Sequence, residues 1–380
     1  MNLRSLLTKV ILRVTYLRKR FIYRSSNPHK KVLLSYVLVP NPDFELGFFY
    51  GQLHNRFLMC RLMIRSLNRL GYDVYLHDYL DTNLNYEIQY DLYIGHNKFF
   101  SRIGEKLNGN CKKVLLTTGC SVEFDNRQLH RRNEDLKKRR GTEDNFFQPM
   151  AEENFAKENC TVADHIFMIG SEFIRDNGWY PVAREKTFLY NNVTVLTPVK
   201  KTTRSGGFVF MSSNGQLRRG LDLVLEAFAG RKEKLFICGP YDLEPIFVKH
   251  FKKELFETNN ITALGFVDQN SDAFRKVLEE ADFAILPSCS EGQSGSLLTL
   301  MTYGLIPIAP DNTGFQNLES LGVRLTEFSV QDIIRSIEHA NGLTMEEIEG
   351  KRKLVYETVL SDFKPESFSR TFETFISKIN

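Results

Sequence analysis

The stretch that decides the fold is Leu286-Pro-Ser-Cys-Ser-Glu-Gly-Gln-Ser-Gly-Ser-Leu-Leu-Thr-Leu-Met-Thr-Tyr-Gly-Leu-Ile-Pro-Ile-Ala309. The apolar run over residues 283–287 predicts a buried strand, residues 296–303 predict a helix, and residues 306–309 predict a second buried strand. A loop of small residues connects the first strand to the helix. This order of elements is typical of a parallel sheet covered by helices.

The small-residue loop Gly292–Ser296 is suited to an anion. Its backbone amides can approach a ligand closely, and they come just before a helix, where unpaired N–H groups and the helix dipole favour negative charge. A diphosphate fits that description. The carboxylate of Glu291 would repel a phosphate, so we interpret it as an acceptor of hydrogen bonds from hydroxyl groups, such as those of a sugar.

A second strand, loop and helix lie at Phe210-Met-Ser-Ser-Asn-Gly-Gln-Leu-Arg-Arg-Gly-Leu-Asp-Leu-Val-Leu-Glu-Ala-Phe228. Arg218 and Arg219 stand at the predicted helix start, where the helix dipole disfavours cations. An anionic ligand explains basic residues there better than helix stability does. The alternative is a surface arginine pair with no ligand.

These segments resemble the group 1 (family 4) retaining glycosyltransferases of the GT-B fold. The resemblance covers about residues 200–345, and it is looser in the N-terminal half. Arg219-Gly-Leu-Asp222 matches the family's helix start, with Arg219 at the usual lysine position. Glu291 matches the first glutamate of the family's Glu-x7-Glu segment, whereas the second glutamate is Thr299 here.

The resemblance implies roles for individual residues. Glu291 would contact hydroxyls of the donor sugar, and Thr299 would stand at the ribose. Arg219, Asn214 and the amides of Gly292–Ser296 would stabilise the negative charge on the departing diphosphate. The full implied donor site comprises Ser213, Asn214, Gly215, Arg219, Gly239, Phe266, Val267, Glu291, Gly292, Gln293, Ser294, Gly295, Ser296 and Thr299.

The N-terminal half carries the expected acceptor side. The run Asp91–His96 resembles the family's strand that ends in a histidine at the cleft, so we group His96 with Glu291 and Arg219 as catalytic residues. The acceptor side would include His54, Asn55, Thr118 and Gly119. The family often has a histidine at the position of Thr118.

The chain as a whole is predicted to be an α/β protein of the GT-B class, with two doubly wound, Rossmann-like domains and a cleft between them. The predicted parts are a basic amphipathic helix over 1–30, an acceptor domain over 31–195, a linker over 196–206, a nucleotide-sugar-binding domain over 207–345, and C-terminal helices over 346–380 that pack back on the N-terminal domain. The linker is polar and has no apolar periodicity.

Apolar periodicity places the individual elements. Strands are expected over 31–39, 72–78, 91–96, 113–118, 163–170, 208–212, 235–239 and 261–266, besides the two quoted above. Helices are expected over 56–70, 127–140, 221–229, 243–256 and 271–280, and two more fill 344–380. The basic run Arg131–Arg140 would be a solvated face or a contact to an anionic acceptor or lipid headgroup.

The leader is basic, because residues 1–42 carry nine lysines and arginines and no acidic residue precedes Asp43. Leu3, Leu7, Val10 and Val14 recur at helical spacing. Such a helix can lie in a membrane interface, pack on the body of the protein, or act as a mitochondrial-type presequence. The expected location is cytoplasmic, with possible peripheral contact to the cytoplasmic face of a membrane through residues 1–24.

Six cysteines without a CxxC pair indicate reduced, buried thiols and no zinc site. No Asp-x-Asp metal motif occurs, so we expect no metal and no cofactor beyond the donor. Nucleic-acid binding is not expected, because the basic residues lack interleaved aromatic residues on a recognised module.

The resemblance implies transfer of a sugar from a nucleoside-diphosphate sugar to a glycan or lipid-linked acceptor with retention, in polysaccharide or glycoconjugate biosynthesis. Two alternatives stay open: a catalytically degenerate GT-B subunit that acts as a binding partner, and a nucleotide-sugar epimerase. The changes at Thr118 and Thr299 motivate the first. The second needs further acid–base residues in the cleft.

Overall fold

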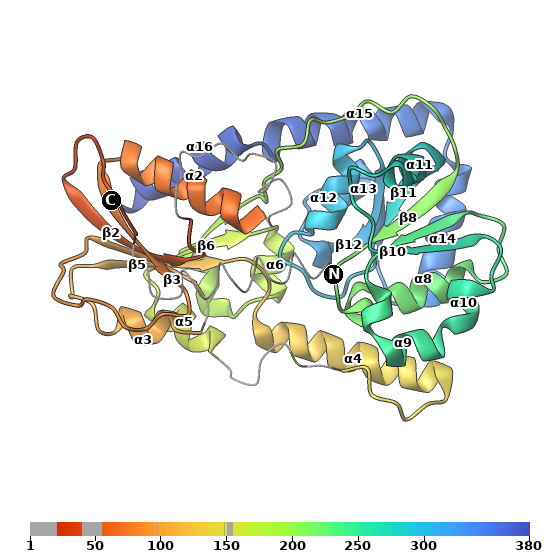
Figure 1. The fold of residues 1–380 in the computed structure, drawn as a ribbon, viewed down its shortest axis with the longest axis horizontal. Coiled ribbons are helices and arrows are strands. Elements are labelled where there is room, and N and C mark those ends of the chain that lie inside the picture. The colour runs from red at the N-terminus through yellow and green to blue at the C-terminus, as the bar shows by residue number, and fades with distance from the viewer. Residues whose placement is uncertain (1–20, 40–54, 97, 148, 150–154) are drawn as a thin grey trace.

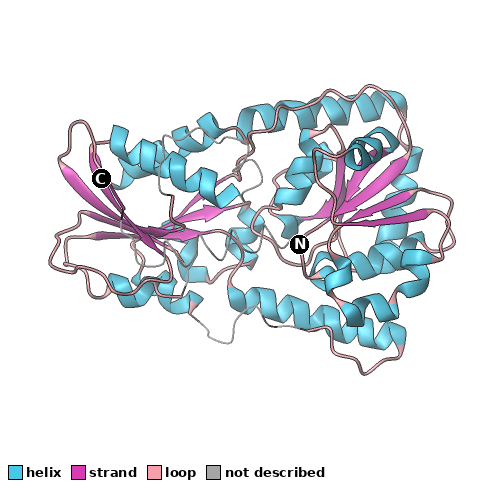
Figure 2. Cartoon of the chain, viewed as in Figure 1, coloured by secondary structure: helices cyan, strands magenta, loops and turns pink. Residues whose placement is uncertain are grey.

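The computed structural model describes residues 21–39, 55–96, 98–147, 149 and 155–380. These residues form two lobes, each built on a mainly parallel sheet with helices on both faces (Figures 1 and 2). The expected α/β architecture with two Rossmann-like sheets is confirmed.

The N-terminal sheet has seven strands in the order β1-β3-β2-β4-β5-β6-β7. Their bounds are Phe21–Tyr23 (β1), Lys30–Tyr36 (β2), Tyr72–Asp78 (β3), Leu92–Gly95 (β4), Lys112–Thr117 (β5), His165–Ile169 (β6) and Thr187–Tyr190 (β7). Neighbouring strands are parallel except that β1 pairs antiparallel with β3. The order reverses between β2 and β4, and ligands bind at the carboxyl ends of strands at such a point.

The C-terminal sheet has six parallel strands in the order β10-β9-β8-β11-β12-β13, which is the Rossmann order 3-2-1-4-5-6. Their bounds are Gly207–Met211 (β8), Leu235–Cys238 (β9), Ile261–Gly265 (β10), Ala281–Ile285 (β11), Ile306–Pro310 (β12) and Val323–Leu325 (β13). The order reverses between β8 and β11. The two segments quoted above therefore leave the sheet side by side, because β8 and β11 are paired neighbours.

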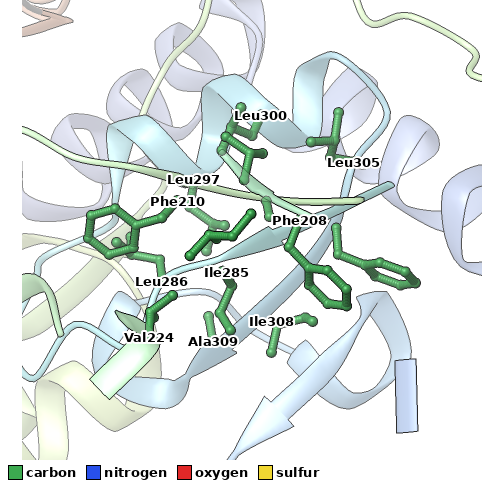
Figure 3. Close-up of a cluster of buried hydrophobic side chains, with 14 of the residues drawn as sticks. Phe208, Phe210, Val224, Ile285, Leu286, Leu297, Leu300, Leu305, Ile308 and Ala309 are labelled. Atoms are coloured by element: carbon green, nitrogen blue, oxygen red, sulfur yellow. The ribbon is translucent and has the colours of Figure 1, made fainter. Parts of the chain in front are cut away.

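The apolar residues of the quoted segments form the core of this lobe (Figure 3). Phe208 and Phe210 of β8 pack with Ile285 of β11 and with the face of a helix that carries Leu297 and Leu300. All five side chains are 2% exposed or less. This packing fixes where the loops between strand and helix begin and end.

The helices connect the strands. In the N-terminal lobe they are Asn55–Arg69 (α2), Phe100–Gly104 (α3), Val122–Arg140 (α4), Ala156–Val162 (α5), Glu172–Asn177 (α6) and the 3-10 helix Pro181–Lys186 (η1). In the C-terminal lobe they are Gln216–Arg219 (α7), Leu221–Phe228 (α8), Tyr241–Leu243 (η2), Pro245–His250 (α9), Lys252–Phe256 (α10), Asp272–Glu280 (α11), Gly295–Thr302 (α12), Asp311–Thr313 (η3), Leu318–Leu321 (α13) and Val330–Gly342 (α14), followed by Met345–Asp362 (α15) and Pro365–Ile379 (α16).

Two expectations about local structure are wrong. The predicted leader helix cannot run through Phe21–Tyr23, because these residues form β1; residues 1–20 lie outside the described part of the chain. The single helix expected over 243–256 is broken. Pro245 opens α9, and at Phe251 the backbone leaves helical geometry (φ −116°, ψ 19°) while its ring stacks on Phe247 at 4.6 Å.

The helices after residue 345 divide between the lobes. α15 packs on α12 and α13 of the C-terminal lobe, contrary to the expectation that both helices return to the N-terminal lobe, and only α16 reaches α2 and β7 (Figure 1). The end of α16 is fixed there, since the Tyr72 hydroxyl donates a hydrogen bond to Asn380 Oδ1 at 2.5 Å.

Helix α4 starts in the N-terminal lobe and runs beneath the C-terminal lobe, where it contacts α7 (Figure 1). Three arginines of the basic run form ion pairs with C-terminal carboxylates: Arg132 with Asp222, Arg139 with Asp222 and Glu226, and Arg140 with Glu226 and Glu254. These arginines are therefore an interface between the lobes and are not a solvated face.

Candidate functional site

The candidate site lies at the carboxyl ends of β8 and β11, on either side of the reversal in the C-terminal sheet. The loop after β8 leads through α7 to Arg219. The loop after β11 carries Glu291 and ends at Ser294, whose hydroxyl accepts the Leu297 N–H and caps α12. The sheet brings these two loops together, although they are far apart in the sequence.

Arg219 and Glu291 form an ion pair, with side chains that are only 14% and 10% exposed. Glu291 Oε1 also accepts a hydrogen bond from the Ser288 hydroxyl at 3.0 Å. Arg219 Nη2 lies 3.3 Å from the hydroxyl of Ser213. The two residues that the sequence singled out are thus in direct contact.

The guanidinium of Arg219 is held in an unfavourable place for a cation. Burial is the main cause that lowers its pKa to about 9; the neighbouring Arg218 contributes to this lowering, while Asp125 opposes it. Its buried Nε has no hydrogen-bond partner within the described part of the chain. A bound anion would supply the missing acceptor, and negative charge in addition to that of Glu291.

Arg218 has a different environment from Arg219. Its Nε donates to the Ser290 carbonyl at 3.2 Å, and its guanidinium lies 3.6 Å from the carboxylate of Asp125. Both arginines end the short helix α7 and directly precede Gly220, the N-cap of α8, so they do stand at the expected helix start. The place of Arg219 before α8, its burial and its unpartnered Nε all favour an anion.

The loop Ser213–Gln216 is partly occupied by the protein itself. The N–H groups of Gly215 and Gln216 donate to the Glu244 carboxylate at 2.6 and 3.1 Å. Ser213 and Asn214 are exposed. Of the donor contacts predicted in this loop, the amide of Gly215 is therefore already used, whereas the side chains of Ser213 and Asn214 face solvent.

The loop that follows Glu291 touches the N-terminal lobe. A Cβ on Gly292 would lie 2.6 Å from Ile169 Cγ2 and 2.7 Å from the Cα of Gly119, so only glycine fits. The side chain of Gln293 is 5% exposed, and its Oε1 accepts the N–H of Asn192 at 2.5 Å. Asn55 Nδ2 in turn donates to Asn192 Oδ1 at 3.2 Å.

The remaining predicted donor residues line the same sheet edge. The Thr299 hydroxyl donates to the Gly295 carbonyl one helical turn earlier, at 2.9 Å, so towards a ribose it is left as an acceptor. The Ser296 hydroxyl lies 3.2 Å from that of Ser294. Gly239 follows β9. Phe266 and Val267 follow β10, and Phe266 is 75% exposed.

His96 lies at the reversal point of the N-terminal sheet, directly after β4. Its ring makes edge contacts with Tyr36 at 5.7 Å and Tyr79 at 5.9 Å, and its Nδ1 lies 3.0 Å from the Leu116 carbonyl. Burial lowers the pKa of His96, and Arg56 adds to this effect, while the Leu116 hydrogen bond opposes it. A neutral imidazole that donates from Nδ1 has an accepting lone pair at Nε2.

The predicted acceptor-side residues are only partly brought to the donor loop. Gly119 contacts Gly292, and Asn55 reaches Gln293 through Asn192. Thr118 is exposed. His54 lies outside the described residues. The contacts of His96 given above are all with the N-terminal sheet, so its place beside the Arg219–Glu291 pair stays a prediction.

Three site residues were missed by the sequence analysis: Asp125, Asn192 and Glu244. Asp125 is 6% exposed and accepts a hydrogen bond from the Ser290 hydroxyl of the opposite lobe. The partners described above lie 28 to 165 positions away in the sequence. No local pattern marks them, because only the folded sheets bring these partners together.

Other kinds of site were also sought. Among the described residues no group of three or more His, Cys, Asp or Glu side chains could hold a metal ion. Over the same residues no helix is long and apolar enough to cross a membrane. A cavity of about 290 Å³ lies between β10 and α11, lined by residues such as Phe236, Thr262 and Val277, and none of its lining residues belongs to the candidate site.

Residues 207–339 match the family model described as Glycosyl transferases group 1, and no curated protein matches the chain. Sucrose-phosphate synthase from Thermosynechococcus elongatus is 13% identical at a TM-score of 0.62, covering 92% of this chain and 99% of that chain. HepE of Anabaena, solved with UDP and glucose, is 12% identical at a TM-score of 0.56, covering 92% and 100%.

A mutant of S. aureus TarM, solved with fondaparinux, α-GlcNAc-glycerol and UDP, is 14% identical at a TM-score of 0.51, covering 74% of this chain and 54% of that chain. The chain thus spans about half the length of TarM. These likenesses establish the two-domain GT-B fold, and the family model covers the lobe that holds Arg219 and Glu291. The chain therefore has the GT-B fold, and its residues 207–339 are similar to the group 1 glycosyl transferases.

Proposed function

We propose that this glycosyltransferase moves a sugar from a nucleoside-diphosphate sugar to a glycan or lipid-linked acceptor, with retention at the anomeric carbon, in polysaccharide or glycoconjugate biosynthesis. The observation that carries the proposal is the buried ion pair between Arg219 and Glu291 at the carboxyl edge of the C-terminal sheet. HepE and TarM were solved with UDP, which makes UDP the first nucleotide to test.

The ion pair supports an exchange of partners when the donor binds. The diphosphate would take the place of Glu291 against Arg219, which satisfies the buried cation and its unpartnered Nε. Glu291, released from Arg219, would then accept hydrogen bonds from hydroxyls of the donor sugar. As the bond to the diphosphate breaks, negative charge grows on the phosphate oxygens, and Arg219 is already in place to stabilise it.

The N-terminal lobe would supply the acceptor side. His96 is kept neutral by burial and has a free lone pair at Nε2, so it suits a hydrogen bond from a sugar hydroxyl. Tyr79, which contacts the His96 ring and is partly exposed, would present an aromatic face to a sugar ring. Asn55 would couple acceptor binding to the position of Gln293 through the hydrogen bonds that both residues make with Asn192.

The other donor contacts would be made by residues near the carboxyl ends of the strands of the C-terminal sheet. Phe266, exposed at the end of β10, would stack on the base beside Gly239 and Val267. The Thr299 hydroxyl would accept a hydrogen bond from the ribose. The amide of Ser294 already donates to the Thr313 carbonyl at 3.0 Å, so the other amides of the loop Gly292–Ser296 would face the diphosphate. No metal is required in this scheme, because Arg219 supplies the positive charge.

The test is a panel of nucleotide sugars incubated with the purified protein, with and without EDTA, followed by an assay for release of the nucleoside diphosphate. Arg219→Ala and Glu291→Ala should each lower turnover by about a hundredfold or more, the usual effect of losing an oxyanion-stabilising group. Arg335→Ala, an arginine that is 52% exposed, is the matched control and should leave turnover unchanged. Unchanged turnover in both site variants would refute the assignment.

A non-catalytic role is the second candidate, and one observation favours it. The amides of Gly215 and Gln216 are already occupied by the carboxylate of Glu244, and the Thr299 hydroxyl donates within its own helix. In a degenerate subunit, the groups that would otherwise bind the donor would form hydrogen bonds within the protein in this way. Calorimetry with UDP, GDP and ADP separates the two candidates, because a degenerate subunit would bind none of them.

A further inference from the structure

Asp125 is a buried carboxylate that the proposed function does not use. It lies near the start of α4, in the N-terminal lobe, and is 6% exposed. Burial raises its pKa, whereas Arg218, the Ser290 hydroxyl and Arg219 oppose that effect. Its carboxylate reaches the C-terminal lobe: the Ser290 hydroxyl donates to Oδ1, and the guanidinium of Arg218 lies 3.6 Å from Oδ2.

The loop that these contacts reach is tied to Arg218 at several points. The Cys289 N–H donates to the Arg218 carbonyl at 3.0 Å, and Arg218 Nε donates to the Ser290 carbonyl at 3.2 Å. Glu291 follows directly in the chain. Arg218 therefore holds the backbone that carries Glu291, and Asp125 holds both Arg218 and Ser290.

A second contact from the start of α4 meets the same loop. Cys120, just before this helix, donates its thiol hydrogen to the Glu291 carbonyl at 2.9 Å. Ser121 then caps α4 through the Phe124 N–H, which fixes the first turn and Asp125 with it. The donor-side loop is thus held from the N-terminal lobe by residues of one rigid helix start.

We propose that Asp125 is a positioning residue of the donor site, which orders the loop Ser288–Glu291 from across the lobes and so places Glu291 for the donor sugar. The inference rests on the proposed function, and it assigns Asp125 no contact with the substrate. On this proposal, Glu291 is correctly placed only when α4 of the N-terminal lobe lies against the C-terminal lobe. Removing the Asp125 charge would therefore loosen Glu291 without removing any group that touches the diphosphate.

The decisive variant is Asp125→Asn, which keeps the size of the side chain and removes the charge that faces Arg218. Ser290→Ala removes the same link from the other lobe and serves if Asp125→Asn fails to fold. Glu134→Gln, on the same helix but with a side chain that is 55% exposed, is the matched control. Three quantities are compared with the unaltered chain: hydrogen exchange of a peptide over 286–297, turnover of the best nucleotide sugar from the panel, and the Kd for UDP.

We expect Asp125→Asn to speed exchange of that peptide and to lower kcat, each by about tenfold or more, with UDP bound as tightly as before or more tightly. Ser290→Ala should show the same pattern with smaller changes, and Glu134→Gln should show none. Unchanged exchange with kcat within about twofold would overturn the proposal, and so would a parallel loss of UDP affinity. If the unaltered chain neither binds UDP nor turns over, the proposed function fails, whereas the exchange comparison still decides whether Asp125 orders the loop.

Discussion

The guanidinium of Arg132 and the carboxylate of Asp222 form an ion pair at 2.6 Å across the two lobes, with side chains that are 4% and 0% exposed. Arg132 lies on α4, and Asp222 belongs to the helix start whose sequence matches the glycosyltransferase family. Both oxygens of Asp222 accept from Arg132 Nη2, at 2.8 and 2.6 Å. The pair therefore joins the basic helix of the N-terminal lobe to the C-terminal lobe, and both side chains are buried from solvent.

Removing one partner of this pair should destabilise the protein strongly. In Asp222→Leu the charge of Arg132 stays buried without its main counter-ion, and we expect a loss of about 3–5 kcal/mol in the free energy of unfolding. Urea unfolding followed by tryptophan fluorescence and circular dichroism measures this loss. Glu134→Gln, which alters an exposed ion pair of the same helix, should change stability by about 0.5 kcal/mol or less.

The double variant Arg132→Met with Asp222→Leu should recover part of that loss, because well-packed apolar side chains can replace a buried ion pair at little cost. The recovery stays incomplete because Arg139 still loses its own ion pair with Asp222. Recovery would mean that each charge is needed only to neutralise the other, and that the ion pair as a whole adds little to the free energy of unfolding. A double variant at least as unstable as the sum of the two single variants would contradict this account.

Local patterns in the sequence mark the two loops of the candidate site. Small residues between a strand and a helix marked the loop after β11, and the sheet order then placed it beside the loop after β8. Arg219 and Glu291 were each singled out in their own segments, and the structure pairs them. Patterns of this kind are readable because a strand, its loop and its helix are neighbours in the chain.

The residues that hold the two lobes together were not predictable in the same way. Arg132, Arg139 and Arg140 read as a solvated basic face, since their partners are 83 to 114 positions away. Asp125 gave no signal for the same reason. Charged residues on a helix look alike in the sequence whether water or another domain covers them, and only tertiary structure separates the two cases.

The fold limits how far a membrane-binding segment in the basic leader can extend. Because Phe21–Tyr23 pair with β3, the membrane-binding segment should end before β1. Deleting residues 1–20 should abolish binding to vesicles of anionic lipid while leaving UDP binding unchanged. The measurement is co-sedimentation with vesicles that contain phosphatidylserine, with neutral phosphatidylcholine vesicles as the comparison. Equal sedimentation of the full chain and the deletion would rule out the leader as the membrane contact.

Arg219 should make UDP binding depend on pH. Its pKa of about 9 means that it loses its charge as the pH rises through that value, and a bound diphosphate favours the charged form. UDP affinity should therefore fall by about tenfold between about pH 8 and about pH 10. In Arg219→Gln the fall should be much smaller. Ionisation of UDP itself is common to both proteins, so equal pH profiles would show that Arg219 does not titrate in this range.

Glu291 and Arg219 should affect UDP in opposite directions, because the carboxylate competes with the diphosphate for the guanidinium. Glu291→Gln removes the competing charge while keeping the side chain's size, and we expect UDP to bind several-fold more tightly, by about 1 kcal/mol. Arg219→Met should weaken binding by about tenfold or more. Turnover should fall in both variants, since Glu291 is needed for the sugar and Arg219 for the departing diphosphate.

Calorimetry with UDP and a turnover assay separate these effects, and Glu338→Gln, with a side chain that is 60% exposed, is the control for the amide substitution. The opposite signs are the informative part of the result. A residue that only supported Arg219 would weaken UDP binding when it is replaced, as Arg219→Met does. Weaker binding in Glu291→Gln would therefore mean that the ion pair persists when the donor is bound. Glu291 would then hold Arg219 in place and would not leave it to contact the sugar.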